Sequence, residues 1–161
     1  MKILLTHGYF LNDDPKEKII MKPYVPLGIL YVSAYLERKG FLNEVFDTTF
    51  SSMQQLQKYL IEFKPDVVAI YVNLMTRLNV LEIIKFIKSN LKQAKIVLGG
   101  PEIRYNATDL LNFGADYLVI GEGEETSLEL IKALNEKRFD DLINIHGLGF
   151  KDQQNKIVFT S

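Results

Sequence analysis

The side chains that most often carry catalysis are few in this sequence. Its two histidines, His7 and His146, lie far apart along the chain, and it has no cysteine. Without cysteine there are no disulfides, zinc–thiolate sites, iron–sulfur ligands or thiol nucleophiles. No histidine–glutamate metal motif and no serine–histidine–aspartate order stands out either. The sequence is therefore more typical of a binding module than of a catalyst.

A double glycine, Gly99-Gly100, is the first candidate for a ligand site. It ends a short apolar segment, Lys95–Leu98, and precedes Pro101. β-branched apolar runs of this length are typical of buried strands. Ligands of open α/β sheets bind outside the carboxyl ends of the strands. Two missing side chains at such an end indicate either a tight turn or a ligand that lies against bare backbone.

Three other candidates also follow predicted strands. His7 follows the segment Lys2–Thr6 and could be a ligand or a base, although a lone histidine is more often structural. Asp47 could contact a ligand or cap the helix that follows, where nearby serines also qualify. Asn73 lies at the predicted switch point of the sheet, which favours a ligand contact over a helix cap.

A second glycine-rich stretch, Gly121-Glu122-Gly123, follows another predicted strand. Helix N-termini attract phosphate, but the glutamates of this stretch would repel it. Thr126 and Glu129 have the spacing of a helix capping box, so we interpret that part as structural. The two glycines still leave open backbone beside the double glycine.

Strand-like and helix-like segments alternate along the chain. Five β–α units predict a doubly wound, five-stranded parallel sheet with helices on both faces, which is a Rossmann-like or flavodoxin-like α/β fold. The third strand is almost entirely apolar, so we expect it to be covered on both faces. The predicted strands are Lys2–Thr6, Glu44–Phe46, Asp66–Val72, Lys95–Leu98 and Asp116–Ile120, and the predicted helices cover 26–39, 53–63, 80–91, 108–113 and 127–135.

Two segments depart from this alternation. The polar stretch from the first strand to Val25 is nearly twenty residues long, and loops of that length are often functional. Near the C-terminus, Leu148–Lys151 and Lys156–Thr160 are typical of the strands of a β-hairpin. We expect residues 1–140 to form one domain and residues 141–161 to form a hairpin that leads into a further domain.

Composition argues against several classes of partner. The 161 residues are 47% hydrophobic and 24% charged, as in globular proteins. The net charge of −1 gives no electrostatic attraction to nucleic acid or to anionic membranes. There is no apolar run of about 18 residues and no signal-peptide pattern. We expect a cytoplasmic protein without nucleic-acid or membrane partners.

Several short motifs occur in a fixed order along nearly the whole chain. They lie at Pro26–Glu37, Gly40–Asp47, Pro65–Ile70, Val97–Pro101, Asp116–Glu124 and Ile145–Phe150. Each is weak alone, but the ordered set resembles the cobalamin (B12)-binding N-terminal domains of cobalamin-dependent radical S-adenosylmethionine (SAM) enzymes. In that family the domain precedes a radical SAM domain with a 4Fe-4S cluster. The resemblance implies a role in methyl transfer or in radical chemistry on an unactivated carbon.

The resemblance also implies where cobalamin would lie. The corrin ring would cover the carboxyl edge of the sheet, and the nucleotide tail would enter a groove beside the fourth and fifth strands. The loop between the first strand and the first helix would border the lower corrin face. The cofactor-binding residues expected in this way are His7, Asp47, Thr48, Asn73, Leu74, Met75, Gly99, Gly100, Pro101, Gly121, Glu122 and Gly123.

One departure from related cobalamin domains concerns the cobalt ligand. Methionine-synthase-type domains carry an Asp-x-His-x-x-Gly motif whose histidine ligates cobalt, and this sequence has no such motif. His7 is the weak candidate for that position, and open or water-ligated cobalt is the favoured state. Asn73 stands where relatives commonly have serine or threonine.

Two other functions remain open from the sequence. The fold could have lost its cofactor and act as a protein-interaction module. Alternatively, the chain could be a stand-alone small-molecule enzyme that uses His7 and Asp47, which requires these two side chains to lie within hydrogen-bonding distance.

Overall fold

The computed structural model describes residues 1–13 and 15–161. Within these residues one seven-stranded sheet has the order β2-β1-β3-β4-β5-β6-β7, and its first five strands are parallel. This arrangement confirms the doubly wound α/β fold. The strands are β1 (Ile3–His7), β2 (Glu44–Phe46), β3 (Val67–Tyr71), β4 (Lys95–Gly99), β5 (Tyr117–Val119), β6 (Leu148–Lys151) and β7 (Ile157–Phe159).

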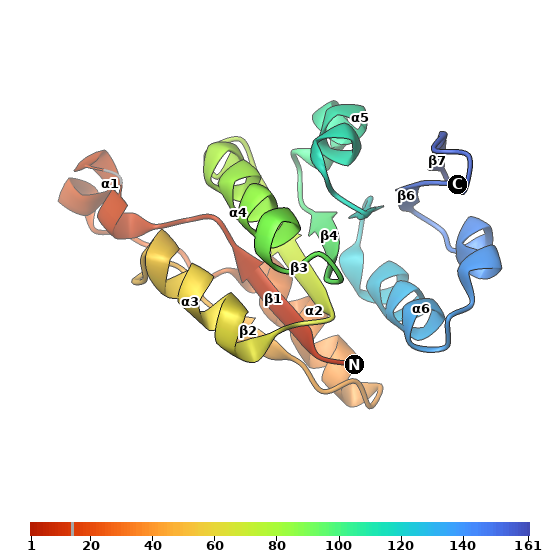
Figure 1. Cartoon of the computed structure of the whole chain (residues 1–161). Helices are drawn as coiled ribbons and strands as arrows, with labels where there is room; N and C mark the ends of the chain where they lie inside the picture. Colours follow the sequence, from red (N-terminus) through yellow and green to blue (C-terminus); the bar gives the residue numbers. More distant parts are fainter. Residues whose placement is uncertain (14) are drawn as a thin grey trace.

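Helices cover both faces of the sheet (Figure 1). One face packs against α2 (Leu27–Arg38) and α6 (Gly123–Asn135). The other face packs against α3 (Met53–Phe63), α4 (Arg77–Asn90) and α5 (Ile103–Phe113). No helix in the described part of the chain is long and apolar enough to cross a membrane.

Alternating side chains of the strands fill two separate cores. In β3, Val68 and Ile70 join the core beneath α3, α4 and α5, whereas Val67 joins the core beneath α2 and α6. Successive residues of a strand point to opposite faces. A strand that is buried on both sides therefore reads as a continuous apolar run, as predicted for this segment.

The C-terminal hairpin belongs to the same sheet. β6 pairs antiparallel with β5, with Val119 opposite Leu148, and β7 pairs with β6. The sequence predicted the hairpin but not this pairing, so the sheet has two more strands than expected. The physical reason is that β5 would otherwise leave its backbone N–H and C=O groups unpaired along an open edge.

Three helices begin earlier than the sequence predicted, and the first of them, α4, starts at Arg77 and not at position 80. Helix α5 starts at Ile103 and continues across a kink at Asn106, where φ is −128° and ψ is 24°. Helix α6 starts at Gly123, so Thr126 lies inside it and the predicted capping box is wrong. The Thr126 hydroxyl instead donates to the carbonyl oxygen of His146 at 2.8 Å, which ties α6 to the segment before β6.

The segment between β1 and α2 is not a plain loop. It contains a 3-10 turn, η1 (Leu11–Asp13), and a short helix, α1 (Pro15–Ile20). A second 3-10 segment, η2 (Phe139–Asn144), connects α6 to the hairpin. Both β1 and β3 end at the sheet edge that faces α1, so this segment lies beside the switch point of the sheet (Figure 1).

Candidate functional site

One side chain is missing from a row at the carboxyl edge of the sheet. Tyr71, Gly99 and Val119 are paired neighbours on β3, β4 and β5. Residues paired in this way face the same side of a sheet, so Gly99 leaves a gap between the other two side chains. A Cβ atom on Gly99 would meet no other atom within 4 Å. The gap therefore opens into space.

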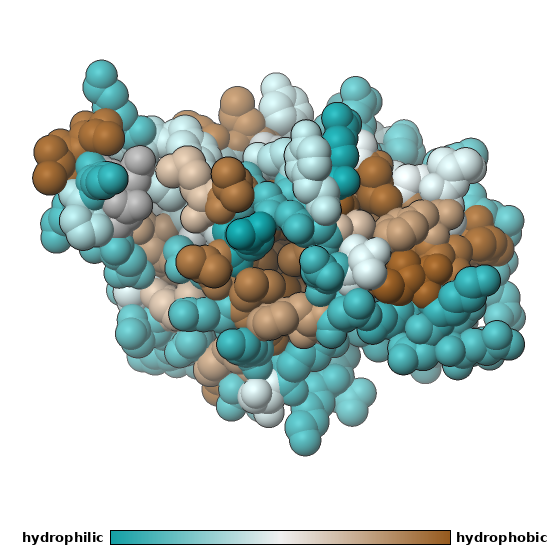
Figure 2. Space-filling model, turned by 90° about the horizontal axis from the view of Figure 1, so that it is seen from above, coloured by the Kyte–Doolittle hydropathy of each residue, from teal (hydrophilic) through white to brown (hydrophobic). Residues whose placement is uncertain are grey.

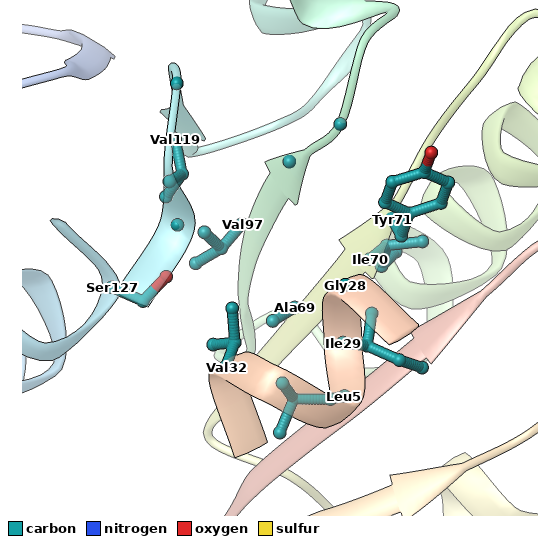
Figure 3. A pocket seen from close by; sticks show the side chains of 14 residues that line it. Leu5, Gly28, Ile29, Val32, Ala69, Ile70, Tyr71, Val97, Val119 and Ser127 are labelled. Atoms are coloured by element: carbon teal, nitrogen blue, oxygen red, sulfur yellow. The ribbon is translucent and has the colours of Figure 1, made fainter. Parts of the chain in front are cut away.

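This gap belongs to a groove of about 160 Å³ between the sheet, α2 and α6. Figure 3 shows the side chains that surround it, with Val97 and Ala69 on its floor. Small residues from three elements leave the space free. The lining comprises Leu5, Ala69, Ile70, Tyr71, Val97, Gly99, Gly100, Val119 and Gly121 from the sheet and its ends, Gly28, Ile29 and Val32 from α2, and Gly123 and Ser127 from α6.

The two adjacent glycines have different physical roles. Gly100 has a φ of +114°, and a Cβ atom there would lie 2.4 Å from the carbonyl oxygen of Val72. Any other residue at position 100 would therefore be strained and would clash with backbone. Gly99 has an ordinary φ and open space beside it. The turn explanation fits Gly100, and the explanation of a ligand against bare backbone fits Gly99.

The second pair of glycines divides in a similar way. Gly121 has a φ of +94° and open space around its missing side chain. A Cβ atom on Gly123 would lie 3.2 Å from Val32, so this glycine lets α6 approach α2 closely. Glu122 between them is exposed and makes no side-chain cap to α6. The groove is therefore narrow between the helices and open at the sheet edge.

Two further cavities adjoin the groove along the same edge. One, of about 260 Å³, contains His7 and Tyr24 and shares Gly28 and Tyr71 with the groove. The other, of about 340 Å³, contains Pro101 and Tyr105 and shares the glycines at positions 100 and 121. Figure 2 looks down on this edge and shows apolar side chains gathered around a hollow. The edge thus offers a continuous recess.

Leu74 and Met75 extend this apolar edge. They follow β3 in the turn before α4, with 73% and 63% of their surfaces exposed. Exposed apolar side chains beside a recess are typical of a surface that binds an apolar partner or ligand. Their position agrees with the expectation that they face a corrin ring, and that expectation stays a prediction.

His7 lies in a buried hydrogen-bonded network and is only 3% exposed. Its Nε2 lies 2.9 Å from the carboxylate Oδ1 of Asp47, and its Nδ1 accepts from the backbone N–H of Tyr9 at 3.2 Å. The Thr48 hydroxyl donates to the carbonyl oxygen of Tyr9 at 2.9 Å. Both ring nitrogens of His7 are therefore engaged within the protein, and neither is free to ligate a metal in this arrangement.

The environment keeps this pair in opposite charge states. Burial lowers the pKa of His7, and the hydrogen bond and charge of Asp47 only partly counteract it. For Asp47, burial acts to raise the pKa, but hydrogen bonds from Thr49 and His7 outweigh it, so the pKa lies below its ordinary value. Near neutral pH a neutral imidazole donates to a carboxylate. The pair thus meets the distance that a stand-alone enzyme would require, but the buried ring has no free nitrogen for a substrate.

Asn73 takes part in a helix-capping arrangement. Its side-chain Oδ1 accepts from the backbone N–H of Thr76 at 3.0 Å, and its own backbone N–H donates to the Thr76 hydroxyl at 3.1 Å. Within the described residues its Nδ2 has no hydrogen-bond partner. The structure thus assigns the carboxamide oxygen to the start of α4, and the predicted ligand contact rests on the free amide nitrogen.

A buried carboxylate near the same edge was not predicted. Glu102 follows the double glycine and Pro101, and it is 4% exposed. Its Oε1 accepts from Arg77 at 2.9 Å and from Asn106 at 2.7 Å, which links the starts of α4 and α5. No group of three or more histidine, aspartate or glutamate side chains within 1–13 and 15–161 could hold a metal ion.

Of the residues that line the groove, sequence reasoning named only the glycines at positions 99, 100, 121 and 123, and three of those it missed are informative. Gly28 lies within the first motif, and a glycine in the first turn of a helix was a usable signal. Tyr71 directly follows the matched part of the third strand, and its ring packs between Gly28 and Gly100. Ser127 was treated as the start of a helix, so its place in the second turn of α6 gave no signal from spacing.

The curated proteins similar to this chain include a methyltransferase and a methylase. The chain is 28% identical to an uncharacterized methyltransferase of Pyrococcus horikoshii over 94% of the chain and 33% of that protein. It is 30% identical to a hopanoid C-3 methylase of Methylococcus capsulatus over 68% of the chain and 22% of that protein. The chain thus spans about a third or less of the length of these curated relatives.

Solved structures share the fold. The cobalamin-dependent S-adenosylmethionine radical enzyme OxsB with aqua-cobalamin bound has a TM-score of 0.84 and 20% identity, over 99% of this chain and 22% of that one. A cobalamin-binding protein from Desulfitobacterium hafniense has a TM-score of 0.59 and 18% identity, over 81% of this chain and 57% of that one. The family model for the B12 binding domain matches residues 21–131, which include α2, β4 and the five glycines that line the groove, and the chain accordingly belongs to the B12 binding domain family.

Proposed function

We propose that the chain binds cobalamin with its nucleotide tail in the groove between α2 and α6 and with its corrin ring over the carboxyl edge. The observation that carries this proposal is the gap at Gly99, where a missing side chain opens a groove in an otherwise packed row. The described residues fit such a ligand, because the groove is apolar and Gly121 is open as well.

The residues of this chain would then have distinct tasks. When bound, cobalamin supplies a cobalt ion that can carry a methyl group or assist radical chemistry. Gly99 and Gly121 give the tail access to bare backbone, and Leu74 and Met75 offer an apolar surface to the ring. The network of His7 fixes the segment after β1 under the ring, and we assign His7 this positioning task and not cobalt ligation.

We further propose that this domain serves a radical SAM enzyme. The similar methyltransferase and methylase are about three times as long as the chain or longer, and OxsB is a cobalamin-dependent radical enzyme. A 4Fe-4S cluster and S-adenosylmethionine would then be bound by a radical SAM domain of the same protein. Because residues 1–161 contain no cysteine, the cluster ligands would come from that domain. In this proposal residues 1–140 hold the cofactor and residues 141–161 lead into the radical SAM domain.

The variant Gly99→Val tests the proposal most simply. Valine fits a strand, and its methyl groups would fill the gap without a backbone clash. We expect the dissociation constant for hydroxocobalamin, measured by titration of the visible spectrum, to rise at least about tenfold. The melting temperature without ligand should stay close to that of the unmodified protein.

The matched control is Ala34→Val on the exposed face of α2. It introduces the same valine side chain outside the groove, so cobalamin affinity should not change. Equal affinity of Gly99→Val and the unmodified protein would refute a tail in this groove. A protein that never changes the cobalamin spectrum would instead support the interaction-module alternative.

A further inference from the structure

Building on the proposed function, we infer that the groove between α2 and α6 selects the base at the end of the cofactor's tail. Cobamides share the corrin ring and differ in this base, which is dimethylbenzimidazole in cobalamin and a purine such as adenine in other members. The chemistry of the lining favours dimethylbenzimidazole over adenine.

The side chains around the groove are mainly hydrocarbon. Ala69, Val97 and Val119 come from the sheet, and Ile29 and Val32 come from α2 (Figure 3). Dimethylbenzimidazole presents a carbon edge with two methyl groups, and burial of that edge against aliphatic side chains is favourable. Adenine presents an amine and ring nitrogens at the corresponding edge.

Polar side chains that could pair with a purine are scarce in the groove. Besides Tyr71, Ser127 is the polar side chain of the described lining, and its hydroxyl has no hydrogen-bond partner among the described residues. In Figure 3 the Tyr71 hydroxyl points away from the floor. One hydroxyl can pair with a single ring nitrogen, as a benzimidazole requires, but it cannot satisfy the additional groups of adenine. Buried polar groups that lose water without a partner weaken binding.

The space available strengthens this selection. The groove measures about 160 Å³, and the gap at Gly99 between Tyr71 and Val119 is one side chain wide. A flat bicyclic base can enter such a slot, whereas a base together with bridging water molecules would need more room. A base in the slot therefore leaves little room beside it for bridging water.

Binding of three corrinoids to the protein tests this inference. The visible spectrum reports the dissociation constants of cobalamin, of the adenine-containing cobamide and of cobinamide, which lacks the base. We expect cobalamin to bind at least about tenfold more tightly than the adenine-containing cobamide, and cobinamide to bind more weakly than cobalamin. Equal affinity for the two complete cobamides, with weaker cobinamide, would overturn the selection and leave the tail in the groove. Equal affinity for all three corrinoids would overturn both the selection of the base and the placement of the tail in the groove.

Two variants and one control connect the preference for cobalamin to single residues of the groove. Val97→Thr adds a hydroxyl to the floor at nearly the same volume and should reduce the preference for cobalamin several-fold. Val158→Thr makes the same change in β7, away from the groove, and should leave the preference unchanged. Ser127→Ala retains helix propensity, and it should weaken both complete cobamides several-fold without affecting cobinamide. An unchanged preference in Val97→Thr, or equal weakening of cobinamide in Ser127→Ala, would contradict the inference.

Discussion

At the scale of single residues, position along the chain says little about which side chains meet. His7 and Asp47 are 40 residues apart in sequence and 2.9 Å apart in space. They meet because β1 and β2 pair in parallel, with Thr6 opposite Phe46, so the next residue of each strand lies at the same edge. Burial then keeps the imidazole neutral, and the hydrogen bond from the backbone of Tyr9 to His7 fixes the loop that follows β1.

This burial predicts a pH dependence of stability. The pKa of folded His7 lies below its ordinary value of 6.5, whereas the unfolded chain protonates the ring near that value. Between the two values the unfolded state binds more protons, so stability falls as pH falls. We expect the free energy of unfolding to decline as pH falls through 6.5 and below, and His7→Gln to flatten that decline.

The measurement is urea unfolding at a series of pH values. Asp47 does not interfere, because its lowered pKa places its contribution in a more acidic range, where stability is lost as pH falls through the folded value. The exposed His146 provides the control, since His146→Gln should keep the decline. A decline of the same size in His7→Gln would contradict the role of burial.

At the scale of elements, the starts of helices α4, α5 and α6 shape the carboxyl edge. Helix α4 begins with the reciprocal hydrogen bonds of Asn73 and Thr76, and Glu102 ties its first residue, Arg77, to α5. Helix α6 begins at Gly123, close against α2. The starts of these helices therefore shape the edge around the groove.

The carboxamide oxygen and the amide nitrogen of Asn73 can be tested separately. Asn73→Ala removes the cap and should lower the free energy of unfolding by about 1 kcal/mol. Asn73→Asp keeps an oxygen for Thr76 but loses the amide donor, so it should keep most of the stability and weaken cobalamin binding. Denaturant unfolding and spectral titration distinguish the two effects. If Asn73→Asp bound cobalamin as tightly as the unmodified protein, Asn73 would cap the helix and make no contact with the ligand.

Local sequence patterns predicted the strands well because each strand is a short apolar run that ends at glycine or a polar residue. The same patterns placed Gly99 at a strand end. They failed where a contact depends on distant residues. Thr126 has capping-box spacing, but α6 already begins at Gly123, which packs closely against α2. The groove wall at Ser127 arises from that same packing, which no local pattern encodes.

At the scale of the whole molecule, the recess lies at one edge of the sheet, between the ends of its strands and the starts of its helices. Helices cover both faces, and the hairpin of β6 and β7 covers the edge of β5 (Figure 1). The recess therefore lies where the parallel strands end, as expected for the ligand site of a doubly wound sheet. A tail placed in the groove would hold its base away from the cobalt ion.

That separation has a direct spectroscopic consequence. The electron paramagnetic resonance spectrum of reduced, bound cob(II)alamin shows nitrogen splitting when an axial nitrogen coordinates cobalt. The base would lie in the groove, and both nitrogens of His7 are engaged within the protein. We therefore expect a spectrum without nitrogen splitting when the protein is saturated with cob(II)alamin, whereas free cob(II)alamin at neutral pH shows the splitting. Persistence of the nitrogen triplets in the bound state would contradict the placement of the tail in the groove.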